Sequence, residues 1–182
     1  IQSFSQEKVL DAVVREALEL SLWAPNHRLT FPWVYSLVGA AARKQIAEVA
    51  IELKERKGPT NDVTKQAIRA SILNPSHYLA IGVKKSLDAS IAQENYATLA
   101  CSVQIAMMYL WDKGIGSKWS TSGYTLNPKT YDILGLSMDD VLLEGCLFIG
   151  KPEATPAPQK RPSLEEVLKK VDEPGKTTAY RI

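Results

Sequence analysis

The segment from Trp23 to Trp33 reads WAPNHRLTFPW and combines hydrogen-bond donors with aromatic rings. Asn26, His27 and Arg28 supply an amide, an imidazole and a guanidinium at three consecutive positions. Such side chains can hold a ligand, and binding residues often lie on loops of this kind. A capped helix end followed by an ordinary polar loop has the same composition, so the residues alone leave both interpretations open.

A second segment, from Gly114 to Gly123, reads GIGSKWSTSG. Its small residues allow a ligand to approach the backbone closely. Ser120 and Thr121 add hydroxyl groups directly after Trp119. A flexible turn between a helix and a strand is the alternative interpretation of this segment.

The best-known catalytic motifs are absent from the sequence. It has no GxGxxG, GxxxxGKS, GxxxxGKT, HExxH, GxSxG or CxxC pattern. His27 and His77 have no neighbouring carboxylate cluster, so a histidine-rich metal site is not expected. The pairs Asp139–Asp140 and Glu165–Glu166 point apart on a helix or a strand, which is typical of solvated charges. The sequence therefore predicts no metal ligand and no acid–base pair.

Helices and strands alternate around the two polar segments. Apolar spacing predicts helices from an N-cap at Ser5 to near Pro25 and over residues 40–57, 61–73, 88–113 and 128–134. Strands are predicted over residues 33–38, 78–83 and 141–149. The first polar segment then joins a helix to a strand, and the second follows the longest helix. This order favours an α+β or α/β class with a small sheet, as one domain over residues 1–182.

The C-terminal part differs in composition from the rest. Four prolines (Pro152, Pro156, Pro158 and Pro162) lie between residues 151 and 163 and predict an extended chain. An amphipathic turn or two over 164–171 and strand propensity over 177–182 follow. We expect residues 151–182 to form an arm that packs on another surface rather than a free linker.

The composition and charge of the chain argue against nucleic-acid and membrane partners. The chain has 182 residues, of which 45% are hydrophobic and 23% charged, with a dispersed net charge of +2. A nucleic-acid partner is therefore not expected. No apolar stretch is long enough to span a membrane, and no secretory signal pattern is present, so we expect a cytoplasmic protein without a membrane partner. Cys101 and Cys146, in apolar surroundings, are expected to be buried thiols.

Taken in order, three motifs resemble the nitroreductase family of FMN-dependent oxidoreductases. Residues 24–33 (APNHRLTFPW) are similar to the branch in which Ala-Pro-Asp/Asn-His-Lys/Arg precedes Gln-Pro-Trp. Glu94–Ala97, with the long helix and the Gly114–Ser117 turn, is similar to the central helix of the family. Phe148–Pro152, followed by Arg161-Pro162, resembles its C-terminal ending. The resemblance runs from Phe4 to about Val167.

The resemblance implies a small, mostly antiparallel sheet flanked by helices in a domain-swapped homodimer, with FMN bound at the dimer interface. It implies cofactor contacts from Trp23, Asn26, His27 and Arg28 in the first segment, of which His27 is the firmest. Trp119, Ser120 and Thr121 would line the flavin from the second segment. Lys160 and Arg161 match the basic group that reaches the FMN phosphate, for which a guanidinium is well suited.

Three features depart from the family pattern. The family normally opens with an Arg-Arg-Ser/Thr segment that holds the FMN phosphate, whereas Ile1–Phe4 resembles the residues after it. Either residues are missing upstream or Lys160 and Arg161 hold the phosphate alone. Phe31 stands where glutamine is common, and Ser120 where the related branch often has arginine.

The leading hypothesis is an oxidoreductase that passes hydride from NADH or NADPH through FMN to a small electron-poor acceptor, a nitroaromatic or a quinone, in two half-reactions. The flavin would carry the chemistry, which agrees with the lack of a catalytic dyad. A flavin-binding or ligand-sequestering dimer with little turnover is the alternative, motivated by Phe31 and the missing arginines. A third hypothesis is an interaction domain whose proline-rich arm binds partners.

A homodimer also has a rationale in the residues. The helix over 88–113 is apolar on more faces than a monomer of this length can cover. Met107, Met108, Tyr109 and Trp111 cannot all point to one core. We therefore expect a second copy of the chain to cover the surplus.

Overall fold

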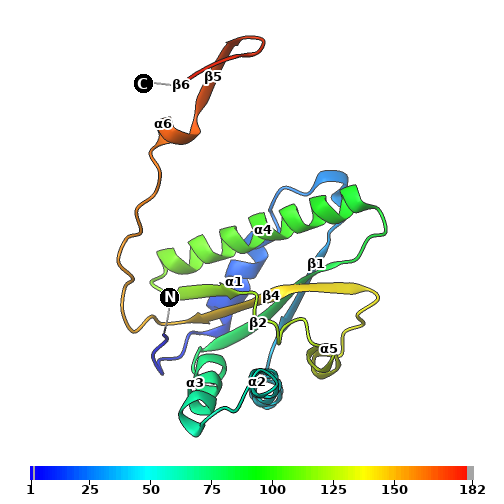
Figure 1. The fold of residues 1–182 in the computed structure, drawn as a ribbon, viewed down its shortest axis with the longest axis vertical. Coiled ribbons are helices and arrows are strands. Elements are labelled where there is room, and N and C mark those ends of the chain that lie inside the picture. The colour runs from blue at the N-terminus through cyan, green and yellow to red at the C-terminus, as the bar shows by residue number, and fades with distance from the viewer. Residues whose placement is uncertain (2, 180–182) are drawn as a thin grey trace.

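A four-stranded antiparallel sheet forms the centre of the molecule in this computed structural model, which describes residues 1 and 3–179 (Figure 1). Its strands are β1 (Trp33–Leu37), β2 (His77–Lys84), β3 (Gly116–Ser120) and β4 (Val141–Gly150). They lie in the order β1-β2-β4-β3, and every neighbouring pair is antiparallel. The strands β1 and β3 therefore form the two edges of the sheet.

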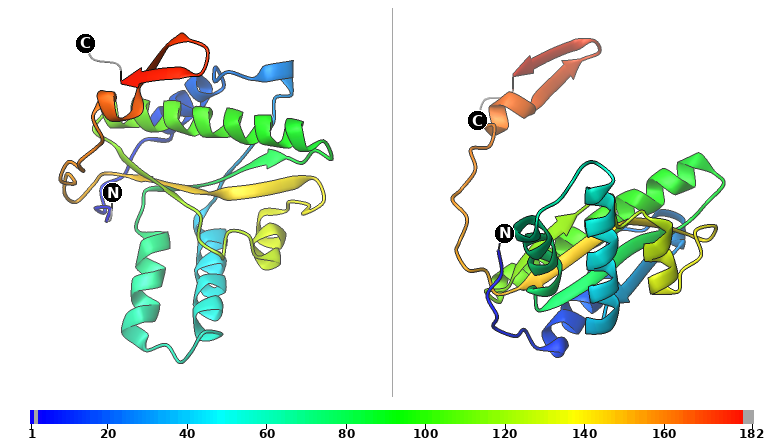
Figure 2. Two further views of the ribbon diagram at one scale, coloured as in Figure 1. Left: turned by 45° about the horizontal axis from the view of Figure 1, so that its top comes forward. Right: turned by 60° about the horizontal axis from the view of Figure 1, so that its bottom comes forward.

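Helices cover both faces of this sheet, as Figures 1 and 2 show. One face carries α1 (Asp11–Ser21) and α4 (Ala89–Asp112), and the other carries α2 (Ala40–Glu55), α3 (Asp62–Leu73) and α5 (Pro128–Leu134). The sandwich confirms the expected α+β class with a small antiparallel sheet flanked by helices.

Each face of the sheet has its own apolar core. On β2, Leu79, Ile81 and Val83 point to the α1/α4 face, while Tyr78 and Ala80 point to the α2/α3/α5 face. The alternation follows from the strand period of two. Because helices cover both faces, seven consecutive residues of β2 are buried.

Three predicted helices begin where a polar side chain caps the first turn. Asn61, Asp88 and Asn127 each accept a hydrogen bond from a backbone N–H at the start of α3, α4 and α5. These contacts satisfy donors that a helix leaves unpaired at its N-terminus. The predicted ends of the three helices are confirmed to within a residue or two.

The predicted start of the first helix was wrong. The helix α1 begins at Asp11, and Ser5 does not cap it. The chain before it is drawn to the sheet, because Phe4 pairs with Pro152 and Val9 donates its N–H to Oγ of Ser76 at 2.9 Å. Tertiary contacts thus override the local helical pattern.

Residues 116–120 form the edge strand β3, whereas a flexible turn was one of the two interpretations left open for this segment. Cys146 is buried as expected, but the expectation for Cys101 was wrong, because Cys101 is exposed on α4.

The C-terminal arm leaves the sandwich after β4 and extends away from it (Figures 1 and 2). It contains α6 (Leu164–Val167), which a capping box of Ser163 and Glu166 begins, and a hairpin of β5 (Lys169–Glu173) and β6 (Lys176–Ala179). The amphipathic segment predicted over 164–171 is thus helical only in its first half. Residues 180–182, at the end of the predicted strand, lie outside the described part of the chain.

None of the helices in the described part of the chain is both long enough and apolar enough to cross a membrane.

Candidate functional site

A cavity of about 390 Å³ lies on the α2/α3/α5 face, between α3 and the edge strand β3. Its lining combines aromatic rings with polar groups. The polar side chains are those of Ser3, Ser71, Asn74, Lys118, Ser120, Ser122 and Glu153. Phe4, Tyr124 and Phe148 provide apolar surface. Such a lining can hold a ligand that is partly aromatic and partly polar.

The strand β3 directs its side chains alternately into this cavity and away from it. Lys118 and Ser120 line the cavity. Trp119 packs instead against the core of the α1/α4 face and donates from Nε1 to the carbonyl of Glu144 at 3.0 Å. Trp119 and Ser120, which the sequence predicted to line the same ligand, therefore point to opposite faces of the sheet. Sequence reasoning missed Lys118, because its direction is defined only once residues 116–120 are known to be a strand.

A buried polar cluster lies behind the cavity wall. The hydroxyl of Tyr124 lies 3.8 Å from Sγ of Cys146, a contact in which either group can donate. Burial raises the pKa of the Cys146 thiol to about 11. It raises the pKa of the Tyr124 phenol as well. Both groups therefore stay protonated at neutral pH, and their hydrogen bond has a structural role.

A buried arginine fixes the other wall of the cavity. The guanidinium of Arg43 donates to the carbonyls of Ile72, Leu73 and Pro75 at 2.6–3.1 Å, and to that of Ser76 at 3.3 Å. Ile72 and Leu73 lie in the last turn of α3, where carbonyls lack helical partners. Burial lowers the pKa of Arg43. The side chain thereby holds the turn that leads from α3 to β2.

The first polar segment forms a loop against α4 on the opposite face of the sheet. Asn26 is its centre: Oδ1 accepts from the N–H of Phe31 at 2.8 Å, and Nδ2 donates to Oγ1 of Thr30 at 3.0 Å. Thr30 then donates to Oδ1 of Asn95 at 2.7 Å, and Thr98 donates to the carbonyl of Pro25 at 3.1 Å. The amide of Asn26 is thus engaged within the loop.

The backbone of this loop is strained. Arg28, Leu29 and Phe31 have φ values of +63°, +50° and +44°. The left-handed conformation costs a residue with a side chain about 1–2 kcal/mol. Such conformations persist only where surrounding contacts impose them, and they concentrate at functional sites.

Glu94 of α4 contacts two side chains of the loop. Its Oε1 lies 3.0 Å from Nδ1 of His27, and its Oε2 lies 3.5 Å from Nε of Arg28. His27 and Arg28 are thus brought together on one carboxylate. Neither the sequence spacing nor a local motif indicated this contact, because the partners belong to different elements.

The remaining predicted residues are exposed. Trp23, with 86% of its surface exposed, borders an apolar hollow of about 570 Å³ next to Leu29 and Phe31. Thr121 is exposed at the end of β3. Lys160 and Arg161 lie exposed in the extended arm and make no polar contact in the described part of the chain.

The two polar segments do not meet within one chain. The loop over 26–31 precedes the edge strand β1 and packs on α4. Ser120 ends β3, the opposite edge strand, and lines the cavity on the other face of the sheet. Figure 1 shows α4 and α3 on opposite sides of the sheet. The described residues of one chain therefore do not bring the two segments together around one ligand.

Comparison with known proteins identifies the family. The sequence model of the nitroreductase family matches residues 1–151. The chain belongs to the nitroreductase family. The Bacillus subtilis (strain 168) protein named "Putative NAD(P)H nitroreductase YfhC" is 24% identical over 168 residues, which cover 91% of this chain and 86% of that protein.

Two solved structures show the same nitroreductase fold. A nitroreductase-like family protein from Bacillus cereus has a TM-score of 0.82 and 21% identity, covering 95% of this chain and 91% of that one. A single-residue mutant of NfnB, an FMN and NADPH-dependent nitroreductase from a Sphigopyxis strain, has a TM-score of 0.75 and 17% identity, covering 97% and 94%. The resemblance inferred from the sequence is confirmed at the level of family and fold.

The residues of the cavity fit FMN. The ammonium of Lys118 suits a phosphate or the electron-rich edge of a flavin, and the hydroxyls of Ser71, Ser120 and Ser122 suit a ribityl chain. The rings of Tyr124 and Phe148 suit an isoalloxazine.

Proposed function

We propose that this protein is an FMN-dependent oxidoreductase that uses NADH or NADPH to reduce a small electron-poor acceptor, a nitroaromatic or a quinone, in the cytoplasm. The observation that carries the proposal is the cavity between α3 and β3, whose lining suits FMN in a chain of the nitroreductase family. Members with related folds are named FMN and NADPH-dependent nitroreductases.

The cofactor would contact residues of both polar segments. Lys118, Ser120 and Ser122 would bind it from the cavity. Asn26, His27 and Arg28 would reach it from the loop of a second copy, with Trp23 beside them. Trp119 packs on the α1/α4 face of β3, away from the cavity, and Thr121 directly follows this strand. Lys160 and Arg161 remain the candidates for the phosphate.

When bound, FMN would supply the redox chemistry, because it can accept a hydride from NADH or NADPH and pass it to the acceptor. The chain's own residues bind and orient the reactants and place charge near them. The cation of Lys118 would stabilise negative charge that develops on the ring. The protons that reduction of the acceptor consumes can come from solvent, so the proposed chemistry requires no acid–base dyad.

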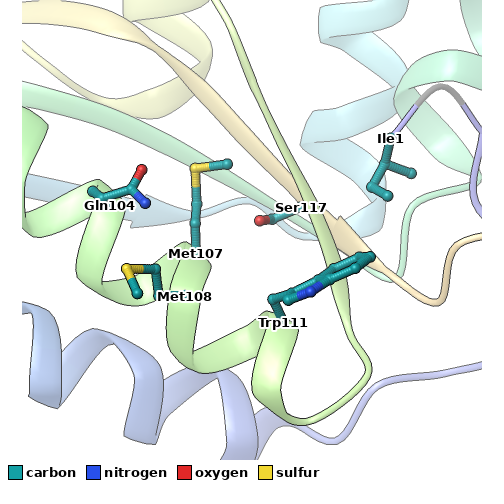
Figure 3. A pocket seen from close by; sticks show the side chains of 6 residues that line it. All are labelled: Ile1, Gln104, Met107, Met108, Trp111 and Ser117. Atoms are coloured by element: carbon teal, nitrogen blue, oxygen red, sulfur yellow. The ribbon is translucent and has the colours of Figure 1, made fainter. Parts of the chain in front are cut away.

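We further propose a homodimer. A hollow of about 380 Å³ lies between α4 and β3, with Gln104, Met107, Met108 and Trp111 from the helix, and Ser117 and Ile1 facing them (Figure 3). Met108 is 64% exposed and Trp111 52%, an apolar surface that a soluble chain normally covers. The second copy would cover it.

The arm over residues 151–182 would pack on the partner of this dimer, within a single nitroreductase-like domain over 1–182. Leu164, Val167 and Val171 are more than half exposed along the arm. The arm extends away from its own sandwich (Figure 2). Exchange of arms between two copies would bury these side chains and give the domain-swapped arrangement.

A flavin-binding dimer with little turnover is the second candidate, because Phe31 replaces an amide that could contact the cofactor. One experiment separates the two. The purified protein is loaded with FMN and mixed anaerobically with NADH or NADPH while the flavin absorbance is followed. Rapid bleaching that a nitroaromatic or quinone reverses supports the oxidoreductase. A yellow protein that does not bleach supports the alternative, and a protein that takes up no FMN contradicts both.

A further inference from the structure

Hydroxyl and thiol groups form a cluster between the core of the α2/α3/α5 face and the cavity. The hydroxyl of Tyr124 lies 3.8 Å from Sγ of Cys146, which is fully buried. On the cavity side, Oγ of Ser120 lies 3.0 Å from Oγ of Ser122. Both serines line the cavity together with Tyr124. The phenol of Tyr124 therefore lies between a buried thiol and the hydroxyls of the cavity.

The sheet register brings these groups together. Ser120 of β3 is the direct partner of Cys146 on β4, and the loop after β3 brings Tyr124 beside the thiol. Burial raises the pKa of the Tyr124 phenol, and the hydroxyls of Ser120 and Ser122 lie close enough to lower it in part. The thiol, the phenol and the two serine hydroxyls are thus neighbours in one cluster.

The buried end of the cluster holds a polar atom without a partner. The side chain of Tyr78 is fully buried, and its hydroxyl makes no hydrogen bond within residues 1 and 3–179. Cys146 and Tyr124 are its polar neighbours. An unpaired buried hydroxyl is costly, so such a group calls for an explanation. This hydroxyl is available to the thiol as a donor or as an acceptor.

Every group of the cluster can both donate and accept a hydrogen bond. In one arrangement, Tyr124 donates to Sγ of Cys146, and its oxygen is free to accept from a ligand. In the other, Cys146 donates to the Tyr124 oxygen, and the phenol proton points to the cavity. The distance of 3.8 Å suits either direction. Rotation of O–H and S–H bonds converts one arrangement into the other without moving a charge.

The backbone around the cluster is anchored by other side chains. Oγ1 of Thr130 donates to the carbonyl of Tyr124 at 2.6 Å. Oγ1 of Thr125 donates to the carbonyl of Ser122, also at 2.6 Å. Both threonines are buried. The loop is therefore held through its main chain, and the side-chain hydroxyls of Tyr124 and Ser122 are not needed to hold it.

We propose that Tyr124 contacts the flavin ring and that Cys146 is a positioning residue, which lets the Tyr124 hydroxyl act as a donor or as an acceptor. The inference rests on the proposed function, because it names the ligand of Tyr124. The ring nitrogen that takes up hydride only accepts a hydrogen bond in oxidised flavin, and it donates one in reduced flavin. A cluster that reverses its hydrogen bonds can therefore bind both redox states.

The first test compares two substitutions of nearly equal size. Cys146→Ala removes the acceptor for the Tyr124 O–H, so the phenol proton is left to the cavity and opposes the N–H of reduced flavin. We expect this variant to bind reduced FMN about tenfold more weakly relative to oxidised FMN, the loss of one hydrogen bond. The two-electron midpoint potential then falls by about 30 mV. Cys146→Ser keeps a group that donates and accepts, so its potential should stay near that of the wild type.

A double substitution shows whether Cys146 acts through Tyr124. In Tyr124→Phe the hydroxyl is gone, and the further change Cys146→Ala should no longer move the potential. Tyr131→Phe is the matched control, because the Tyr131 hydroxyl accepts from the N–H of Leu143 at 2.9 Å and lies outside the described lining of the cavity. In that background, Cys146→Ala should still lower the potential.

An infrared measurement reports on the thiol directly. The chain has two cysteines, and Cys101→Ser leaves Cys146 as the sole source of the S–H stretching band. Without FMN, Tyr124→Phe should shift this band, because it removes the hydrogen-bond partner of the thiol. With FMN bound to the protein that keeps Tyr124, reduction by dithionite should shift the band, because the thiol changes from donor to acceptor.

The outcomes separate this inference from the proposed function. Equal potentials of Cys146→Ala and Cys146→Ser, or an S–H band that is the same with oxidised and reduced FMN, would overturn the role of Cys146 and leave the oxidoreductase standing. The infrared measurement keeps the cluster intact, so it decides the matter even if Cys146→Ala fails to fold. A wild-type protein that takes up no FMN would overturn the proposed function and this inference together.

Discussion

The two faces of the sheet hold their polar residues by different means. On the α2/α3/α5 face, the helix α3 and the strand β3 direct side chains into the cavity, and the chain segments beside them complete its lining. On the α1/α4 face, the loop over 26–31 has three left-handed residues and is held by side chains of Asn26, Thr30 and Glu94. Substitutions of cavity side chains should therefore change ligand affinity. Substitutions of the side chains that hold the loop should lower the local stability of the loop.

The largest loss of stability is expected at Gly145 of β4, where the neighbouring strand β3 leaves no room for a side chain. Gly145 has a φ of +124°, and a Cβ there would collide with the carbonyl oxygen of Ser120. We expect Gly145→Ala to lower the free energy of unfolding by about 3 kcal/mol, measured by urea denaturation. Gly123→Ala is the control, because no atom lies within 4 Å of its Cβ position. Equal stability of the two variants would contradict the close approach of β3 and β4.

The next largest loss of stability is expected at Arg43, which holds one wall of the cavity. Arg43→Met removes the donors to the carbonyls at the end of α3, and we expect a loss of about 2 kcal/mol in unfolding free energy. The exposed Arg69, which pairs with Glu48, serves as comparison, and Arg69→Met should cost less than about 1 kcal/mol. If both variants unfold at the same urea concentration, Arg43 does not fix the wall.

A substitution inside the cavity should separate affinity from stability. We expect Lys118→Met to weaken FMN binding about tenfold, because one charge-assisted contact is lost. The unfolding midpoint without FMN should stay near that of the wild type. Titration by flavin fluorescence measures the affinity, with Lys129→Met as a control outside the cavity. An unchanged affinity in Lys118→Met would place the flavin elsewhere.

The smallest effect on global stability is expected in the loop. Asn26→Ala removes the acceptor of the Phe31 N–H and the donor to Thr30, and we expect a cost of about 1 kcal/mol confined to this segment. Hydrogen exchange of the peptide over 23–33 should speed up several-fold, while exchange in β2 stays slow. Uniformly faster exchange across the chain would show that the loop is not an independent local unit.

The sequence predicted the elements whose signals are local. Asn61, Asp88 and Asn127 mark helix starts by their capping chemistry, and the apolar run of β2 marks a strand covered on both faces. The start of α1 was wrong because Val9 is held by Ser76, a contact that no local pattern contains.

The site was predicted less completely than the fold. The strand β3 contains glycine and serines, so its strand state comes from pairing with β4 rather than from propensity. Without that strand, the opposite directions of Trp119 and Ser120 and the place of Lys118 could not be derived. The contact of Glu94 with His27 joins residues far apart in the sequence, which one sequence does not reveal.

We propose that two copies of this chain bind FMN, and one experiment tests this directly. The purified protein is incubated with excess FMN, unbound flavin is removed by gel filtration, and the absorption spectrum and the mass of the eluted species are measured together. We expect a dimer that retains one FMN per chain. A colourless protein, or a monomer that retains flavin, would contradict it.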